Sequence, residues 1–468
     1  MATALLIAHV LGIVSSFDSL MRTRTSPGAI AWIVALNTFP LLSVPAYWIF
    51  GRTKFHGYRL LRQQVDVASS ECIGGIRKKL HPFAHDVSGS HNALAGAQLA
   101  KLDYLTGNAV ELLVDGHKTF ESILAGIDHA QEYVLVQFFI IHCDGIGSAL
   151  RDKLIAKAKA GVKVWLLFDE IGCKGLPQSY LEGLRAAGAR VSSFHSTRGV
   201  MNRFQLNFRN HRKIVVVDGA HGWVGGLNVG DEYLGKSERL PNWRDTHVKI
   251  SGPSVLELQV SFIEDWRWAT DELLDLPCSP RPAADGNATV LILPTGPADR
   301  LESASLMYQA AIHSARKRIW IASPYFIPDE GVLAALHIAA LGGIDVRAII
   351  PDKSDRRLVY YGAFAFAGAL IESGVGIFRY QPGFLHEKVF LVDDRLVGIG
   401  TANLDNRSFR LNFEVTALIH DEKFTADVER MFEADFARAR RMTAEEVQAK
   451  SWLFRSLARA SYLLAPIQ

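Results

Sequence analysis

Residues 27–50 form a run without any charged side chain, rich in Ala, Ile, Leu, Val and Trp. A helix of this length crosses a hydrocarbon core of roughly 30 Å. Trp32 and Trp48 lie toward the two ends of the run, where aromatic rings favour the membrane interface. The pattern predicts a transmembrane helix that is kinked or shortened at Pro40 and Pro45, which membrane helices tolerate.

An earlier apolar run, residues 2–17, stops at Asp18 and is short for a span. A signal peptide is the alternative interpretation, but no basic segment precedes the run. We expect a short or tilted first helix, so that residues 1–54 form a membrane anchor with one or two transmembrane helices. More basic residues follow the second run than precede it, which predicts that the body of the protein faces the cytoplasm. These residues are Arg22 and Arg24 before the run, and Arg52, Lys54, Arg59 and Arg62 after it.

Beyond the anchor, short apolar runs typical of strands alternate with helical patterns in two successive series. Such alternation predicts an α/β fold in which helices cover a mostly parallel or mixed sheet. The two series have the same order, and AGVKVWLLFD at 160–169 is echoed by GGIDVRAIIPD at 342–352. The body is therefore predicted to be an internal duplication of one domain. The expected strands are 110–114, 133–140, 162–168, 289–293, 319–323 and 344–350, and the expected helices are 118–130, 147–160, 301–315 and 331–340.

The domain boundaries follow from this alternation. We expect a connector at 55–105, where periodicity is weak, a first domain at 106–276 and a second domain at 287–440. The proline-rich segment between the two domains is predicted to be a linker. Residues 441–468 form an amphipathic tail with interleaved arginines, which suits either a helix at the membrane interface or a helix packed on the second domain.

Composition excludes several classes of protein. The chain of 468 residues is 49% hydrophobic and 21% charged with a net charge of +3, so it is not a long disordered protein. The small net charge gives no support for nucleic-acid binding, which calls for a clearly basic domain. The four cysteines form no CxxC pair, which argues against zinc ribbons and favours reduced thiols. His81, His85 and His91 lack companions at a zinc spacing, so we expect them to be solvated.

One motif occurs twice with identical spacing, once in each predicted domain. Each copy has a histidine, a lysine two positions later, an aspartate five positions after the lysine, and a glycine that precedes an asparagine by three positions. The first copy is His211, Lys213, Asp218, Gly225 and Asn228, and the second is His386, Lys388, Asp393, Gly400 and Asn403. Two copies in matching places are not a coincidence, so we treat them as the candidate site.

The local pattern indicates what these residues do. Apolar runs at 213–217 and 388–392 predict strands, on which alternation puts the histidine and lysine on one face. Two lysine charges and two asparagine donors suit the oxygens of a phosphodiester as charge develops on them. Two imidazoles can serve as nucleophile and general acid. The aspartates, Asp218 and Asp393, belong to the catalytic signature, and we expect them to brace the turn after each strand rather than touch phosphate.

The twin motifs resemble those of the phospholipase D superfamily, and the flanking phrases are similar to bacterial cardiolipin synthases of the membrane-anchored type. The phrases are QLNFRNHRKIVVVDG (205–219), GGLNVGDEY (225–233), WRDTHVKISGP (243–253), SPYFIPDE (323–330) and GTANLDNRSFRLNFE (400–414). The resemblance covers nearly the whole chain. It implies two duplicated phospholipase D-like domains, each a mixed sheet flanked by helices, behind a transmembrane anchor in the bacterial cytoplasmic (inner) membrane.

The resemblance also implies a reaction and its partners. Two phosphatidylglycerol molecules give cardiolipin and glycerol, with His211 as the nucleophile that carries the phosphatidyl group and His386 as the acid. The partners are phosphatidylglycerol and other anionic phospholipids in the membrane, with no nucleic acid. No cofactor and no metal are expected, because Lys213 and Lys388 supply the positive charge that a metal would.

Asp245 and Glu414 are predicted to orient the catalytic histidines. Each lies on a strand-like run beyond its motif, in equivalent places of the two halves, and the resemblance points to the same positions. A carboxylate that accepts one imidazole N–H fixes which nitrogen is free to react. Three alternatives compete with the synthase: a phospholipase D that uses water as acceptor, a nuclease of the same superfamily, and a catalytically silent membrane scaffold.

Overall fold

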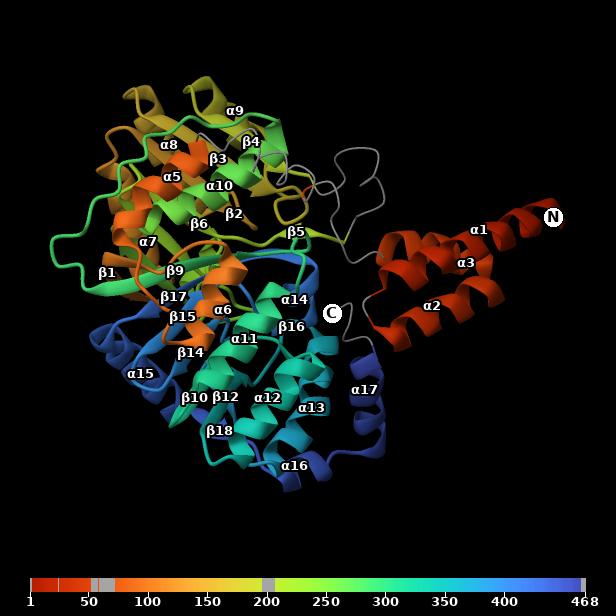
Figure 1. Ribbon diagram of the computed structural model, residues 1–468. Helices are drawn as coiled ribbons and strands as arrows, with labels where there is room; N and C mark the ends of the chain where they lie inside the picture. Colours follow the sequence, from red (N-terminus) through yellow and green to blue (C-terminus); the bar gives the residue numbers. More distant parts are fainter. Residues whose placement is uncertain (1, 24, 52–57, 59–71, 196–206, 464–468) are drawn as a thin grey trace.

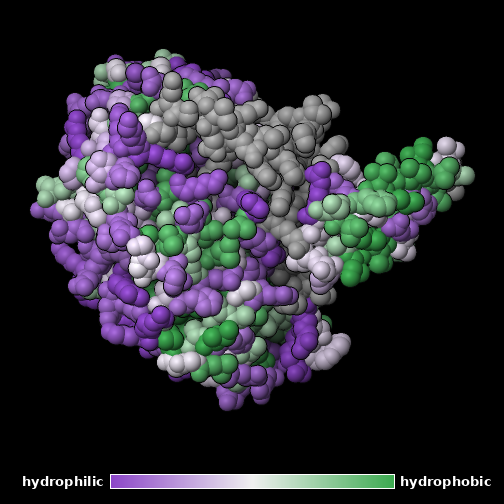
Figure 2. Space-filling model, viewed as in Figure 1, coloured by the Kyte–Doolittle hydropathy of each residue, from purple (hydrophilic) through white to green (hydrophobic). Residues whose placement is uncertain are grey.

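The computed structural model describes residues 2–23, 25–51, 58, 72–195 and 207–463 (Figure 1). An α/β body carries three apolar helices that project from one side of it (Figure 1). The surface of these helices is strongly hydrophobic (Figure 2). The basic residues Arg24, Arg52, Lys54, Arg59 and Arg62, on which the predicted orientation rests, lie outside the described residues.

The first apolar run is a longer helix than its sequence suggests. Helix α1 spans Ala2–Arg22 and continues through Asp18, whose carboxylate pairs with Arg22 at 2.8 Å and accepts a hydrogen bond of 2.8 Å from the Tyr47 hydroxyl. These contacts satisfy the charge that would otherwise end an apolar helix. Among the described residues, α1 is the helix long and apolar enough to cross a membrane.

The prediction of a transmembrane helix at 27–50 is wrong. This run is divided into α2 (Ser26–Thr38), α3 (Pro40–Ala46) and a π-helical turn (Tyr47–Gly51). Phe39 leaves the helical conformation between them, and Pro40 begins the next helix, where a missing N–H costs nothing. The break at Phe39 therefore replaces one long span by two short helices.

The two short helices form a hairpin beside α1. The backbone of Leu36 approaches Gly12 so closely that a Cβ at Gly12 would lie 2.3 Å from its carbonyl oxygen. Two contacts show that the chain then turns back. The ring of Tyr47 lies 5.3 Å from the ring of Trp32, and the Tyr47 hydroxyl donates to Asp18. The second apolar run thus enters and leaves at the same end of α1.

The body contains one continuous sheet that joins the two halves. Its order is β18-β13-β12-β10-β14-β15-β17-β9-β1-β8-β7-β6-β2-β3-β4, with β5 paired to β17. In the first half the strands are β1 (Leu105–Val114), β2 (Tyr133–Phe138), β3 (Lys163–Asp169), β4 (Arg190–Phe194), β5 (Arg209–Asn210), β6 (Ile214–Val217), β7 (His221–Gly225) and β8 (Thr246–Ser251). In the second half they are β9 (Ala288–Thr295), β10 (Arg318–Ala322), β12 (Asp345–Pro351), β13 (Gly376–Tyr380), β14 (Val389–Val392), β15 (Leu396–Gly400), β17 (Asn412–His420) and β18 (Ala439–Arg441).

The strand order shows the duplication directly. The sequence of neighbours β4-β3-β2-β6-β7-β8-β1 has the same connectivity as β13-β12-β10-β14-β15-β17-β9. The innermost strands, β1 and β9, pair antiparallel at the centre, for example at Asn108 and Ala288. The expected strands and helices are all present with ends shifted by a few residues, so the predicted fold class is confirmed.

Helices cover both faces of the sheet. Alternate strand residues point to opposite faces, as Leu135 does relative to Val134 and Val136. One face carries a core shared by both halves under α10 and α15, and the other face carries a separate core in each half. The helices of the first half are α7 (Asp115–Asp128), α8 (Gly145–Lys159), α9 (Gln178–Ala186) and α10 (Val255–Thr270). Those of the second are α11 (Ser303–Ser314), α12 (Glu330–Leu341), α13 (Arg357–Glu372) and α15 (Glu422–Ala437).

The segment expected to be a connector contributes to the body. It contains α5 (Cys72–Leu80) and α6 (His91–Ala100), and Ala97 and Ala100 are buried in the core of the second half. Tyr58 is also buried, among Phe194, Trp268 and Phe413. His81, His85 and His91 are exposed, as expected.

Candidate active site

Both motif histidines lie where the two halves meet. The sequence pattern predicts that His211 and His386 lie on the motif strands. These strands begin at Ile214 and Val389, so both histidines precede them instead. Each histidine is instead held by the other half through its backbone. The His211 N–H donates to the Phe413 carbonyl at 2.9 Å, and the His386 N–H donates to the Arg244 carbonyl at 2.7 Å.

Each histidine side chain is likewise paired with a carboxylate from the other half, and we call this arrangement crossed. Nδ1 of His211, in the first half, lies 2.8 Å from Oε2 of Glu414 in the second half. Nδ1 of His386, in the second half, lies 2.7 Å from Oδ2 of Asp245 in the first. Because an ionised carboxylate only accepts, each Nδ1 carries the proton and each Nε2 keeps its lone pair. The structure therefore provides two oriented imidazoles, each free to react through Nε2.

Both carboxylates are themselves fixed from a second side. The other oxygen of Glu414 accepts hydrogen bonds from Ser408 Oγ at 2.9 Å and Asn412 Nδ2 at 3.1 Å. Oδ1 of Asp245 accepts from the Thr246 N–H at 2.8 Å. Ser408 and Asn412 were not singled out in the sequence, although both lie in the phrase at 400–414. Their spacing from Glu414 carries no recognisable pattern.

Burial sets the protonation of the imidazoles. It lowers the pKa of His211 to about 4, against the opposing effect of Glu414, and lowers the pKa of His386 to about 4, helped by Lys388. Both rings are therefore neutral near pH 7 in the unliganded site. A neutral imidazole with a protonated Nδ1 is the form that attacks phosphorus through Nε2.

Burial also acts on the lysines and the carboxylates. It lowers the pKa of Lys213 to about 7 and that of Lys388 to about 8. Burial alone would raise the pKa of Asp245 and Glu414. Lys388 and the hydrogen-bonded ring of His386 hold the pKa of Asp245 below its ordinary value, and the hydrogen-bonded ring of His211 and Lys213 do the same for Glu414. The site thus holds two anionic carboxylates and two lysines. An incoming anion would raise the pKa of both lysines and so favour their charged form.

Each motif lysine contacts the histidine of its own motif, and the motif asparagines have other neighbours. Lys213 Nζ donates to the His211 carbonyl at 2.8 Å, and Lys388 Nζ donates to the His386 carbonyl and lies 2.8 Å from Nδ1 of that ring. Asn228 Oδ1 accepts from the Ile140 N–H at 3.2 Å. Asn403 Oδ1 is buried without a hydrogen-bond partner in the described part of the chain. Both asparagines are buried, as are both lysines.

The motif aspartates lie apart from this cluster, at the far ends of β6 and β14. The Asp218 carboxylate accepts 2.8 Å hydrogen bonds from the backbone N–H groups of residues 131–133. The Asp393 carboxylate accepts from the N–H groups of residues 316–318 at 2.8–3.1 Å. Both have a positive φ, 53° and 52°. Asp218 and Asp393 thus brace the start of β2 and β10, and their place among the catalytic residues is corrected to a structural one.

Buried arginines link the two catalytic clusters to the helices. Arg212 pairs with Asp265 of α10 at 2.9 Å and donates to the Glu414 carbonyl at 3.0 Å. Arg244 pairs with Asp435 of α15 at 2.7 Å and with Glu387 at 2.9 Å. The arginines come directly after His211 and directly before Asp245, so they fix the backbone on which the site is built.

The fold and the paired motifs define a duplicated phospholipase D-like protein. A family model described as "Cardiolipin synthase, PLD-like domain" matches residues 123–266 and 308–436, and one described as "Phospholipase_D-nuclease N-terminal" matches residues 4–52. The chain belongs to the PLD-like cardiolipin synthase family.

Individual relatives agree with this assignment. The chain is 48% identical to a Pseudomonas putida protein named "Cardiolipin synthase A", over 98% of this chain and 96% of that one. It is 46% identical to the protein of the same name from Pseudomonas fluorescens, with the same coverage. A phosphatidylserine synthase from Haemophilus influenzae has a similar fold, with a TM-score of 0.60, 18% identity, and coverage of 81% of this chain and 100% of that one.

Proposed function

We propose that this protein is a cardiolipin synthase that transfers the phosphatidyl group of one phosphatidylglycerol to another and releases glycerol. The observation that carries the proposal is the crossed pairing of His211 with Glu414 and of His386 with Asp245 in one buried site. Similarity to proteins named cardiolipin synthase over nearly the whole chain supports the same substrate class. Phosphatidylglycerol and other anionic phospholipids are therefore the proposed partners in the membrane.

The first step forms a covalent intermediate. Nε2 of His211 attacks the phosphorus, the bond to the glycerol oxygen breaks, and protonated Nε2 of His386 gives its proton to that oxygen. The negative phosphodiester raises the pKa of His386 on binding, which supplies the proton that the unliganded site lacks. Lys213, Lys388 and the asparagine side chains hold the phosphate oxygens as charge develops.

The second step reverses the roles. A hydroxyl of a second phosphatidylglycerol gives its proton to the now neutral Nε2 of His386, and its oxygen attacks the phosphorus. The bond between phosphorus and His211 breaks, and the ring returns to its starting form. One phosphodiester replaces another, so the reaction needs no nucleotide, and the lysine charges take the role that a metal has in other phosphoryl transfers.

Hydrolysis is the alternative outcome, with water in place of the second lipid. The purified full chain is given phosphatidylglycerol in mixed micelles, and the products are identified by mass. Cardiolipin with glycerol supports the synthase, phosphatidic acid with glycerol indicates a hydrolase, and no product indicates a scaffold. Trapping the lipid adduct and mapping it to His386 instead of His211 would reverse the assignment of nucleophile.

The orientation of the anchor supports a body on the cytoplasmic face of the inner membrane. The hairpin of α2 and α3 returns the chain to the end of α1 that carries Arg22, and basic residues on the cytoplasmic side favour that side for this end. A membrane-impermeant thiol reagent applied to intact cells is expected to modify a cysteine introduced at Ala2 but not the exposed Cys143. Modification of Cys143 in intact cells would place the body outside.

A further inference from the structure

The last helix of the chain, α17 (Trp452–Leu463), is packed on one side only. Its inner side contacts α13, where the Phe454 ring lies 5.0 Å from the rings of Tyr361 and Phe364. Ala458 is buried in the same contact. Packing on the second domain, one of the two interpretations of this tail, therefore accounts for the inner side of the helix and leaves the outer side without a partner within the described residues.

The outer side of α17 presents large apolar side chains to the surroundings. Trp452 is 75% exposed, Leu453 62% and Leu457 41%. Leu453 and Leu457 are one turn apart and form a continuous apolar strip, with Trp452 at the start of the helix. Such a strip on a packed helix marks a surface that contacts another apolar medium.

The charges on this helix are all of one sign. Arg455 and Arg459 are exposed on it, and no acidic residue occurs from Val447 to the end of the chain, whereas Lys450, before the helix, lies 4.0 Å from Glu446. A helix that combines exposed Trp and Leu with arginines is typical of one that lies in the headgroup region of a bilayer. Cations near an anionic lipid surface add to the attraction of such a helix.

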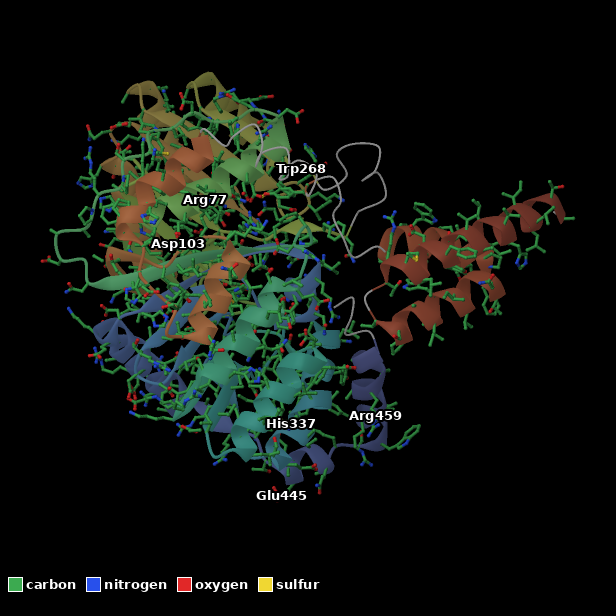
Figure 3. The ribbon with its side chains drawn as sticks, viewed as in Figure 1. Arg77, Asp103, Trp268, His337, Glu445 and Arg459 are labelled. Atoms are coloured by element: carbon green, nitrogen blue, oxygen red, sulfur yellow. The ribbon has the colours of Figure 1, made fainter. Side chains whose placement is uncertain are left out.

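The position of α17 agrees with this chemistry. It runs along the edge of the second half that faces the apolar helices α1–α3 (Figure 1), and Arg459 lies on that edge (Figure 3). A series of packed elements also connects α17 with the active site. Helix α13 packs on β11 (Phe326–Ile327), which pairs with β16 (Leu404–Asp405), the strand that follows Asn403 directly.

We propose that the outer side of α17 lies in the headgroup region of the membrane that holds the anchor. The protein then has two separate membrane contacts, the apolar helices at its N-terminus and the strip of Trp452, Leu453 and Leu457 at its C-terminus. Two contacts fix the tilt of the body, which one contact alone would not, and bring the edge next to Asn403 against the lipid surface. This inference concerns docking and does not depend on which reaction the site performs.

The first test measures contact with lipid in the full chain. A fluorophore is attached at Leu453→Cys, in a background that carries Cys143→Ser, and the protein is reconstituted in vesicles of equimolar phosphatidylglycerol and phosphatidylcholine. The matched control carries the fluorophore at Leu341→Cys on α12, which is 74% exposed in the same half. Nitroxide-labelled lipids are expected to quench the probe at position 453 and not at 341. Equal quenching at the two positions, or none at 453, would overturn the proposal.

The second test measures the consequence for turnover. Replacing Trp452, Leu453 and Leu457 together by serine is expected to lower turnover of phosphatidylglycerol embedded in vesicles about fivefold or more, because interfacial binding scales with buried apolar area. Turnover of a short-chain phosphatidylglycerol dissolved as monomers is expected to stay unchanged. The control, Ile338→Ser with Leu341→Ser, is expected to affect neither substrate. Equal losses on both substrates would refute a docking role, whereas a wild-type protein inactive on both would refute the proposed function alone.

Discussion

Glu414 is the residue at which the crossed geometry is tested most directly. Its side chain is fully buried, and one oxygen accepts the Nδ1 proton of His211 at 2.8 Å. Glu414→Gln keeps the shape of the side chain but removes its charge and replaces one acceptor by a donor. If the amide nitrogen faces His211, the ring must accept at Nδ1 and carry its proton on Nε2, where attack on phosphorus is blocked.

The loss of charge acts on two further groups. Glu414 opposes the lowering of the pKa of His211 by burial, and it does the same for Lys213. Without it the pKa of Lys213 falls below about 7 and the positive charge that holds the phosphate is lost near neutral pH. The comparable change in a serine protease triad costs about 10⁴-fold in turnover. We expect a loss of at least about 10²-fold here, or roughly 2.7 kcal/mol of transition-state stabilisation.

The assay compares turnover and folding in the same preparations. Cardiolipin formed from phosphatidylglycerol in mixed micelles is measured by mass for the wild type, Glu414→Gln and Asp245→Asn, and thermal unfolding is followed by circular dichroism. We expect a large loss of turnover in both variants with a small change in unfolding temperature. Near-normal turnover in both variants, with unchanged unfolding, would show that the carboxylates do not orient the histidines.

Asp218→Asn is the matched control. Asn retains one oxygen for the backbone N–H groups of Glu132 and Tyr133 and tolerates the φ of 53° at this position. The variant loses the 2.8 Å bond from the Gln131 N–H and is expected to lower the free energy of unfolding by about 1–2 kcal/mol. Turnover of the folded fraction is expected to stay near the wild-type value. A loss as large as that of Glu414→Gln would return Asp218 to the catalytic set.

Four other outcomes are expected. Activity is expected to survive EDTA, and activity that vanishes with EDTA and returns with Mg²⁺ would contradict the role given to the lysines. The pKa of about 4 for His211 and His386 lies below the unfolded value near 6.5, so the unfolded chain binds more protons between these two values. The free energy of unfolding therefore rises with pH across this window, by up to roughly 3 kcal/mol for each ring. Urea unfolding of the wild type and of the double His→Asn variant measures this rise, and an equal dependence on pH in the two proteins would contradict it. Deleting residues 1–54 is expected to preserve turnover in micelles, and a truncated protein that is folded but inactive would contradict this. The truncation retains Tyr58, whose hydroxyl donates to Asp265 at 2.7 Å. Tyr58→Phe is expected to lower the free energy of unfolding by about 1–2 kcal/mol, measured by thermal unfolding.

The body of the protein was predictable because its signals are local. A strand buried on both faces has a continuous apolar run, and a repeated motif survives duplication with its spacing unchanged, so the strands and both His-Lys pairs were found. The crossing of the pairs was not predictable. In chain order, Asp245 follows His211 and Glu414 follows His386, and only the pairing of β1 with β9 and the contacts across the junction exchange them.

The anchor shows the opposite limit of the sequence. The interruption next to Pro40 was predicted as a kink, but hydropathy sums side chains and cannot register that the chain turns back there, so the apolar run was predicted as one span. The same sum treats Asp18 as a stop, although a neighbouring arginine and the Tyr47 hydroxyl satisfy its carboxylate and the helix continues to Arg22. Both errors arise because contacts between segments, not composition, decide where these helices end.

The crossed contacts make each half dependent on the other for its chemistry. His211 takes its tautomer from Glu414 and its backbone position from the Phe413 carbonyl, and His386 takes the same from Asp245 and the Arg244 carbonyl. A half that separated from its partner would lose the carboxylate, the backbone contact and the second lysine together. The duplicated chain thus keeps both imidazoles oriented only while its two halves stay in contact, and that dependence agrees with the presence of both complete motifs on one polypeptide.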